Sequence, residues 1–350
     1  MIHMSNQPKD RDALMRGMTL IELILVLLIL AMLAGLLISS ADTMMDRARV
    51  DETERRGQAV SQAICSDGSS CGRFLADLGR PPLLVRTDKG KQLSELWAPD
   101  ERFAGAYGRS AAIVDWGEEI QGVNPQTEFA LDCGWRGPYL QPGNDVFYDG
   151  WPEGGWSLFL SGIGWVDPDA DGNMPSGCEG GMILKIRSLG ADRAEGGADW
   201  IDIDREYPAH GDFLSATADL LVTVFYKPQA ENGYRPVDEN ESDSPNQLRL
   251  ALLLPAGNQA CYVRLRWSDS EWDFWKDNPR LSPEIKGLLA AARISFSQVK
   301  LRGIIPGPRL IYAYGYRREG ANAMAFYGRP IAVHLRPGDN EVASYLRRQD

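Results

Sequence analysis

One carboxylate in the sequence stands where a charge is costly. Glu22 is the single charged residue in a 21-residue apolar run from Met18 to Ile38. A lone ionised carboxylate inside a bilayer costs about 2.5–3.5 kcal/mol or more, so such acids are usually paired and functional. We therefore expect Glu22 to have a cationic partner and a role beyond anchoring.

A second group of acidic side chains has the spacing of a tight turn. Asp167, Asp169 and Asp171 alternate along the chain and are followed by Gly172. Calcium takes several hard oxygen ligands at about 2.3–2.6 Å, which alternating aspartates can supply. An EF-hand is excluded, because Cys178 stands where such a loop needs a bidentate glutamate. The pattern predicts either a calcium loop or a solvated acidic turn.

The sequence lacks the residue patterns of most common catalytic, metal and nucleotide-binding sites. The three histidines, His3, His210 and His334, are far apart and have no metal-ligand or catalytic spacing. No phosphate loop, dinucleotide fingerprint or nucleophile elbow occurs. With Lys+Arg 37 against Asp+Glu 48, the net charge of −11 argues against a general nucleic-acid binder. We expect a protein that is not an enzyme and does not bind nucleic acid.

The apolar run predicts a membrane-spanning helix. Residues 18–38 extend over roughly 31 Å at about 1.5 Å per residue, which matches the hydrocarbon core of a bilayer. Lys9, Arg11 and Arg16 precede the run, which predicts a cytoplasmic N-terminus and an exported remainder. We expect the helix to continue to residue 63, because no proline interrupts it and a thin stripe of apolar residues runs along its charged second half.

The junction before this helix carries a recognisable signature. The segment Arg16-Gly17-Met18-Thr19-Leu20-Ile21-Glu22-Leu23 resembles the cleavage and methylation site of type IV prepilins and type II secretion pseudopilins. The resemblance implies that prepilin peptidase removes residues 1–17 by cutting Gly17–Met18, and that Met18 is then N-methylated. It also implies that Glu22 pairs with the amine of a neighbouring pilin or pseudopilin subunit in the inner membrane. The alternative is a plain membrane anchor.

Residues 64–207 then resemble a pseudopilin head. The segment from Ser188 to Asp199 is similar to the calcium loop of the major pseudopilin of type II secretion. The resemblance implies carboxylate ligands from Asp192 and Asp199 and a carbonyl ligand from Leu189. Arg193 stands where that family has glycine, which places the loop geometry in question. A metal-free acidic turn is the alternative.

The five cysteines allow two bridges in an exported protein. Cys65 and Cys71 could close a short loop, and Cys133 and Cys178 are a possible second pair. The connectivity stays open at this point. Cys261 is expected to be a buried thiol in a strand.

Residues 212–350 predict an added all-β sandwich. The segments rich in β-branched and aromatic residues are 220–226, 248–254, 261–267, 294–300, 309–314 and 331–335. Six strands at fairly regular spacing favour a sandwich, and the pattern from Phe296 to Tyr314 loosely resembles transthyretin-like and carboxypeptidase-regulatory-like domains. Short helices are expected near 278–292 and 342–348. An aromatic cluster is either core or a ligand-binding patch, and it comprises Trp267, Trp272, Phe274 and Trp275.

Together these features predict an α+β protein: a long N-terminal transmembrane helix (18–63) packed on a pilin-like β head (64–207), followed by a β-sandwich (212–350). The predicted function is that of a minor or accessory pilin-like subunit of an inner-membrane-anchored filament, with its bulk in the periplasm or outside the cell. Calcium is the expected cofactor. The alternative function is an adhesin or substrate-binding subunit that acts through the sandwich, and an anchored exported enzyme is the remaining hypothesis.

Overall fold

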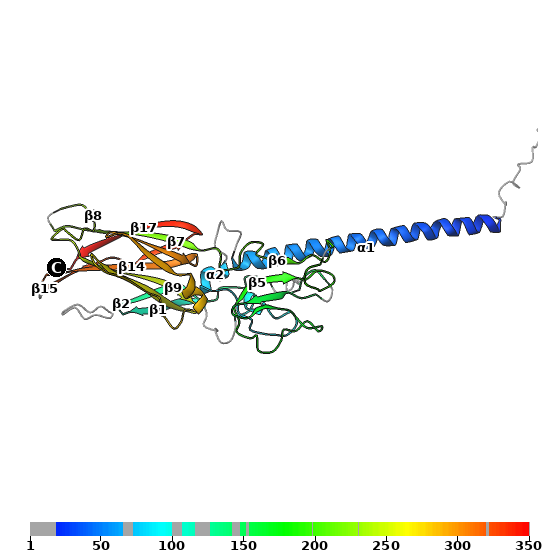
Figure 1. Ribbon diagram of the computed structural model, residues 1–350, viewed down its shortest axis with the longest axis horizontal. Coiled ribbons are helices and arrows are strands. Elements are labelled where there is room, and N and C mark those ends of the chain that lie inside the picture. Colours follow the sequence, from blue (N-terminus) through cyan, green and yellow to red (C-terminus); the bar gives the residue numbers. More distant parts are fainter. Residues whose placement is uncertain are drawn as a thin grey trace, which may run out of the picture. The chain divides into compact units, whose positions relative to one another are not determined.

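The computed structural model describes residues 19–65, 73–99, 107–115, 127–141, 148–151, 154–197, 199–229, 231–319 and 322–349. Gly17, Met18 and Cys71 lie outside these residues. The chain divides into two compact units, Met1–Asp51 and Glu52–Asp350. The combination of one long apolar helix and a large β-sheet body agrees with the predicted α+β class (Figure 1).

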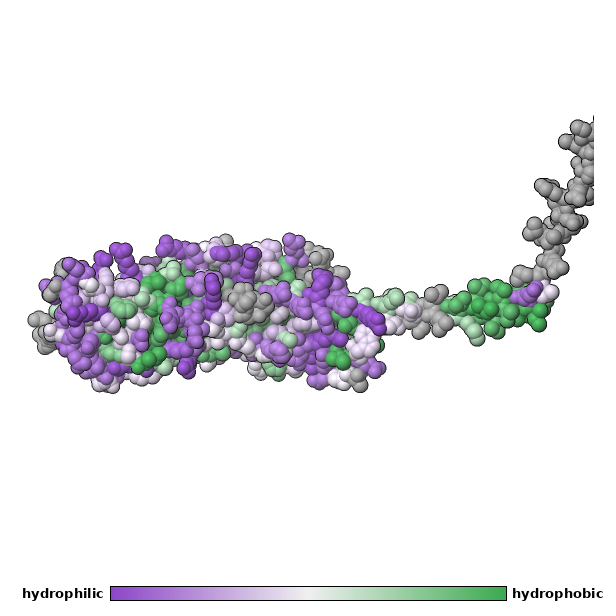
Figure 2. Space-filling view, turned by 90° about the horizontal axis from the view of Figure 1, so that it is seen from above, coloured by the Kyte–Doolittle hydropathy of each residue, from purple (hydrophilic) through white to green (hydrophobic). Residues whose placement is uncertain are grey.

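Helix α1 (Leu20–Ile64) has 45 residues and confirms the predicted long helix to within a residue or two. Leucine, isoleucine and alanine dominate its first half, and no proline breaks the backbone hydrogen bonding. The large apolar side chains from Leu20 to Leu33 are exposed, and Figure 2 shows this part of α1 as a mostly hydrophobic surface. By length and composition, α1 can cross a membrane.

In the second unit, the end of α1 packs on a four-stranded antiparallel sheet. The sheet has the order β4-β3-β5-β6 and comprises β3 (Ser157–Leu160), β4 (Gly164–Val166), β5 (Ile183–Ser188) and β6 (Arg205–Tyr207). Val60 and Ile64 of α1 are fully buried in the same core as Leu158 and Ile186. Gly57 permits the close approach, because a Cβ atom there would collide with the ring of Tyr207. The chain between α1 and these strands forms helix α2 (Arg73–Leu78), which contacts the larger sheet described next, and the 3-10 turn η2 (Ser94–Leu96).

Strands β7 to β17 form an 11-stranded sheet. Its path is β11-β10-β9-β14-β15-β17-β7-β13-β12, with β16 on β14 and β8 on β7. The strands are β7 (Ala218–Tyr226), β8 (Arg235–Pro236), β9 (Gln247–Ala256), β10 (Gln259–Ser268), β11 (Trp272–Trp275), β12 (Ala290–Ser295), β13 (Gln298–Ile304), β14 (Gly307–Glu319), β15 (Asn322–Tyr327), β16 (Ile331–Leu335) and β17 (Gly338–Arg348).

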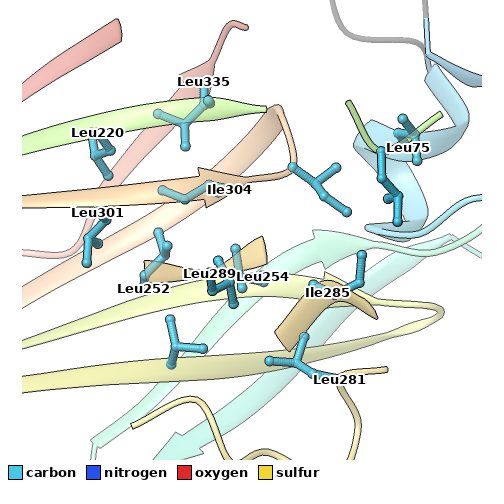
Figure 3. Packing of buried hydrophobic residues seen from close by; sticks show 14 of the residues in the cluster. Leu75, Leu220, Leu252, Leu254, Leu281, Ile285, Leu289, Leu301, Ile304 and Leu335 are labelled. Carbon is cyan, nitrogen blue, oxygen red and sulfur yellow. The ribbon is translucent and has the colours of Figure 1, made fainter. Parts of the chain in front are cut away.

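Two halves of this sheet face each other like a sandwich. Buried and half-buried residues alternate along all of β7, as expected for a strand with one face in a core. In Figure 3, Leu220 and Leu301 from one half point toward Leu252 and Leu254 from the other. The halves join where β15 pairs with the end of β17, at Phe326↔Arg348 and Tyr327↔Arg347. Ser282 caps the start of helix α3 (Pro283–Leu288), because its hydroxyl accepts from the amide of Ile285.

A two-stranded ribbon forms a third layer on this sheet. Strands β1 (Gly108–Val114) and β2 (Thr127–Cys133) pair with each other. Their inward residues share a second core cluster with the outer face of β9, β10 and β14. The ring of Phe129 lies 4.4 Å from that of Tyr312, and Ser110 accepts from the amide of Ala260 at 2.7 Å. A ribbon from the segment predicted to belong to the head therefore packs on the sandwich.

Three local predictions in this region were wrong. The tail predicted as a helix is strand β17, which pairs in parallel with β7 over nine residues from Gly338 to Leu346. The segment 294–300, predicted as one strand, contains the tight β12–β13 turn. The helix predicted over 278–292 is limited to α3, since β12 already begins at Ala290. In each case a long-range strand pairing outweighs local propensity.

The cysteines of the body do not form the second predicted bridge. Cys133, Cys178 and Cys261 carry free thiols. Cys133 belongs to the second core cluster, whereas Cys178 packs against the first, so the bridge predicted between them is not formed in the structure. Cys261 is buried in β10, as expected. Cys65 is buried just after α1, and its predicted partner Cys71 lies outside the described residues.

Candidate functional site

Glu22 lies in the first turn of α1, where it forms a reciprocal cap with Thr19. The backbone amide of Thr19 donates to Glu22 Oε2 at 2.9 Å, and the Thr19 hydroxyl donates to the same oxygen at 3.1 Å. In return, the amide of Glu22 donates to Thr19 Oγ1 at 3.4 Å. This is the geometry of a capping box, which starts a helix and satisfies its free amides. Reasoning from the sequence found Glu22 but missed Thr19, although the Thr-x-x-Glu spacing signals such a cap.

The capped carboxylate of Glu22 lies close in sequence to the predicted scissile bond. Thr19 is the residue after Met18, so a cut at Gly17–Met18 would create an amine one residue from the cap. Neutral hydrogen-bond donors hold the Glu22 carboxylate within its own chain, but they do not neutralise its charge. The negative charge of Glu22 can therefore still pair with a cation from another chain.

The two predicted acidic loops converge on one arginine. Arg187 of β5 lies 2.9 Å from Glu195, 3.6 Å from Asp167 and 3.6 Å from Asp204. Its side chain is only 4% exposed, and its guanidinium carbon lies 4.3 Å from the centroid of the Trp165 ring. The guanidinium thus links β5 to both loops through charge-assisted contacts and a cation–π contact. Reasoning from the sequence missed Arg187, because nothing in its local pattern marks it.

The described carboxylates do not gather as calcium ligands would. Asp169 Oδ1 accepts from the amides of Asp171 and Asn173, and Asp192 Oδ1 accepts from that of Ala194, so both cap their own turns. Within the described ranges, no group of three or more His, Cys, Asp or Glu side chains is placed to hold a metal.

Only some of the predicted ligands lie together. Asp167, Asp169 and Leu189 line one cavity of about 310 Å³, whereas Asp171, Asp192 and Asp199 are exposed and do not line it. As arranged, these residues do not fit a calcium ion, and Arg187 supplies the positive charge between the loops. Calcium binding stays a prediction, to be tested by titration.

Arg193 adopts the backbone conformation that glycine would provide at this position of the loop. Its backbone has φ 56°, the left-handed conformation that glycine adopts without cost. A non-glycine residue there costs roughly 1–2 kcal/mol. The loop between Ser188 and Asp202 therefore keeps a glycine-like turn without the glycine, and the amide of Ala191 still donates to the carbonyl of Ile201 at 3.0 Å.

Asp149 connects this cavity to α1. Its carboxylate is 3% exposed and accepts from the Ser188 hydroxyl at 2.7 Å and from the amide of Trp151 at 3.2 Å. Its backbone carbonyl accepts from Arg56 Nη1 at 3.0 Å. Burial raises the pKa of Asp149 to about 6, against the opposing effect of these hydrogen bonds and of nearby arginines. Gly154 makes room for the carboxylate, since a Cβ atom there would collide with it.

Asn in place of Asp149 is expected to stabilise the protein at neutral pH. A raised carboxyl pKa favours the neutral form, so the stabilisation is present below pH 4 and is lost as pH rises through about 6. The rise of the pKa from 3.8 to about 6 limits this contribution to the free energy of unfolding to about 3 kcal/mol. We expect Asp149→Asn to raise the free energy of unfolding by about 2 kcal/mol at pH 7.5. Thermal unfolding of both proteins between pH 4 and 8 measures this. The exposed Asp171→Asn is the control, and an equal response of the two variants would contradict the prediction.

The predicted aromatic cluster divides between core and surface. Trp267 is buried, and its indole N–H donates to the carbonyl of Phe296 at 2.9 Å. Trp275 contacts the guanidinium groups of Arg264 and Arg266 at 4.9 and 4.6 Å. Trp272 is 44% exposed. Trp267 and Phe274 therefore belong to the first core cluster or pack against it, whereas Trp272 lies at the surface.

No protein-family model matches the sequence, and a comparison with curated proteins finds no match.

Proposed function

We propose that this protein is a pilin-like structural subunit of an inner-membrane-anchored filament, in a minor or accessory role. The observation that supports it most is the position of Glu22. The one carboxylate of the apolar helix segment lies in the first turn, capped by Thr19, directly after the prepilin-like cleavage signature. A helix that served only as an anchor has no need of a charge there.

In this proposal the N-terminus is cytoplasmic and the second unit lies in the periplasm or beyond it. Prepilin peptidase cuts Gly17–Met18, and the new amine of one subunit pairs with Glu22 of another. An ion pair makes two charges tolerable in lipid that would each be costly alone. The exposed apolar surface of α1 then packs against the same surface of neighbouring subunits.

N-terminal mass measurement tests this proposal directly. The full-length protein is produced with and without a prepilin peptidase. We expect a mature chain that begins at N-methyl-Met18 only when the peptidase is present, and no cleavage of a Gly17→Val variant. An intact residue 1–17 segment in the presence of active peptidase would leave only a plain anchor. A known prepilin in the same cells controls for peptidase activity.

A second candidate function is ligand binding by the sandwich, as an adhesin or substrate-binding subunit. It is favoured by exposed aromatic side chains on this part of the molecule, of which Tyr345, at 48% exposed, is an example. This function is compatible with filament assembly, because it uses a different part of the chain.

A further inference from the structure

A groove on the sandwich is lined almost entirely by tyrosine and arginine. Its volume is about 410 Å³, within the range of small-molecule sites. The lining residues are Tyr234, Tyr327, Arg329, Ile331, Tyr345 and Arg347. They come from β15, β16, β17 and the segments that precede β8 and β16, at the end of the sandwich where Figure 1 marks the C-terminus.

The aromatic rings of the groove are held in place by their neighbours. Tyr345 stacks on Phe225 at 5.4 Å between ring centroids, and Tyr234 meets Tyr345 edge-on at 5.0 Å. Arg347 Nε donates to the Tyr234 hydroxyl at 2.8 Å. The ring of Phe225 thus supports one face of Tyr345, while the Tyr345 side chain stays half-exposed. Because these rings are already held in place, the protein loses little further side-chain entropy when a ligand stacks on Tyr345.

The charge of the groove is opposite to that of the chain. Among the described residues that line it, only Arg329 and Arg347 are charged, whereas the whole protein carries −11. Guanidinium groups recognise carboxylates by charge-assisted hydrogen bonds, and a local positive field favours an anion over a neutral ligand. The ligand should therefore be anionic.

We propose that this groove binds an acidic oligosaccharide, with a sugar ring on Tyr345 and uronate carboxylates at Arg329 and Arg347. The phenol rings offer flat apolar faces for the C–H side of a pyranose, and their hydroxyls can exchange hydrogen bonds with sugar hydroxyls. An acidic peptide fits less well, because Ile331 is the single aliphatic side chain among the described lining residues. The inference deepens the ligand-binding candidate and is independent of the N-terminal chemistry.

Calorimetric titration of the full-length protein in detergent micelles tests the proposal. The probes are hexagalacturonate, the neutral maltohexaose as matched control, and a hexaglutamate peptide. We expect hexagalacturonate to bind at least about tenfold more tightly than either control. Its affinity should fall as NaCl is raised from about 50 to about 500 mM, because salt screens the arginines.

Variants assign the binding to the groove. Tyr345→Ala and Arg347→Gln should each weaken hexagalacturonate binding about tenfold, and Tyr345→Phe should retain it. Trp272→Ala, at an exposed aromatic residue on β11 outside the groove, should bind as the wild type does. Equal thermal unfolding temperatures would show that the variants are folded.

Three results would overturn the assignment: no binding of hexagalacturonate, equal binding of maltohexaose or hexaglutamate, or equal losses in Tyr345→Ala and Trp272→Ala. None of them bears on cleavage at Gly17–Met18, so failure of this assignment is distinct from failure of the assembly proposal.

Discussion

Glu22→Ala is expected to be cleaved by prepilin peptidase and to abolish filament assembly. The cut needs the junction at Gly17–Met18, whereas assembly needs a negative charge to receive the neighbour's amine. Without the carboxylate, an incoming amine is left unpaired in lipid, at a cost of about 2.5–3.5 kcal/mol or more for every subunit added. Mass spectrometry of the N-terminus reports cleavage, and sedimentation of sheared filaments reports assembly.

The cap with Thr19 requires a control, because Glu22→Ala removes both a charge and a helix cap. Thr19→Ala keeps the carboxylate and removes the hydroxyl, at about 0.5–2 kcal/mol of helix stability. We expect Thr19→Ala to assemble. Glu22→Gln keeps a hydrogen-bond acceptor without the charge and should fail like Glu22→Ala. If Thr19→Ala failed as completely as Glu22→Ala, capping would explain the defect and the charge-pairing mechanism would be wrong.

Arg187→Ala is expected to destabilise the second unit by about 3 kcal/mol. Breaking a fully buried ion pair typically costs about 3–5 kcal/mol, because the remaining charge loses its partner. The expected loss is at the low end of this range because Glu195 and Asp167 remain largely solvated, and exposed partners contribute little. Loss of the contact with Trp165 adds to the effect. Thermal or urea unfolding followed by tryptophan fluorescence measures it, with Arg302→Ala, an exposed arginine near Asp219, as the matched control.

The same measurement separates arginine from calcium as the link between the acidic loops. If Arg187 links the two loops, EDTA and calcium leave the unfolding temperature of the wild type unchanged. If calcium provides it, EDTA lowers that temperature, and Asp192→Asn or Asp199→Asn removes the response. A calcium-dependent wild type combined with a stable Arg187→Ala variant would contradict the linking role of Arg187.

Sequence patterns were sufficient where structure depends on neighbours along the chain. The apolar run and the absence of proline predicted a helix over 18–63, close to the observed α1 (Leu20–Ile64), because helical hydrogen bonds are local. Strands β7, β9, β10, β14 and β16 were found from β-rich segments between turn residues. The role proposed for Glu22 rests on the same kind of local signal, a single charge in an apolar run.

What the tertiary structure alone decided depends on residues far apart in sequence. The segment 342–348 has no strong strand pattern, yet it becomes part of β17 because β7 offers it a parallel edge. Nothing near Arg187 in the sequence marks this residue, and only the folded loops bring Asp167, Glu195 and Asp204 around it. Tyr234, Tyr327 and Tyr345 likewise meet only when the sheet closes between β15 and β17.

The sequence by itself determined the long helix and the strands β7, β9, β10, β14 and β16, since these follow from local hydrogen bonding and hydrophobic periodicity. Only the fold decided which charges and rings became partners, since such contacts depend on long-range strand pairing that no local pattern encodes.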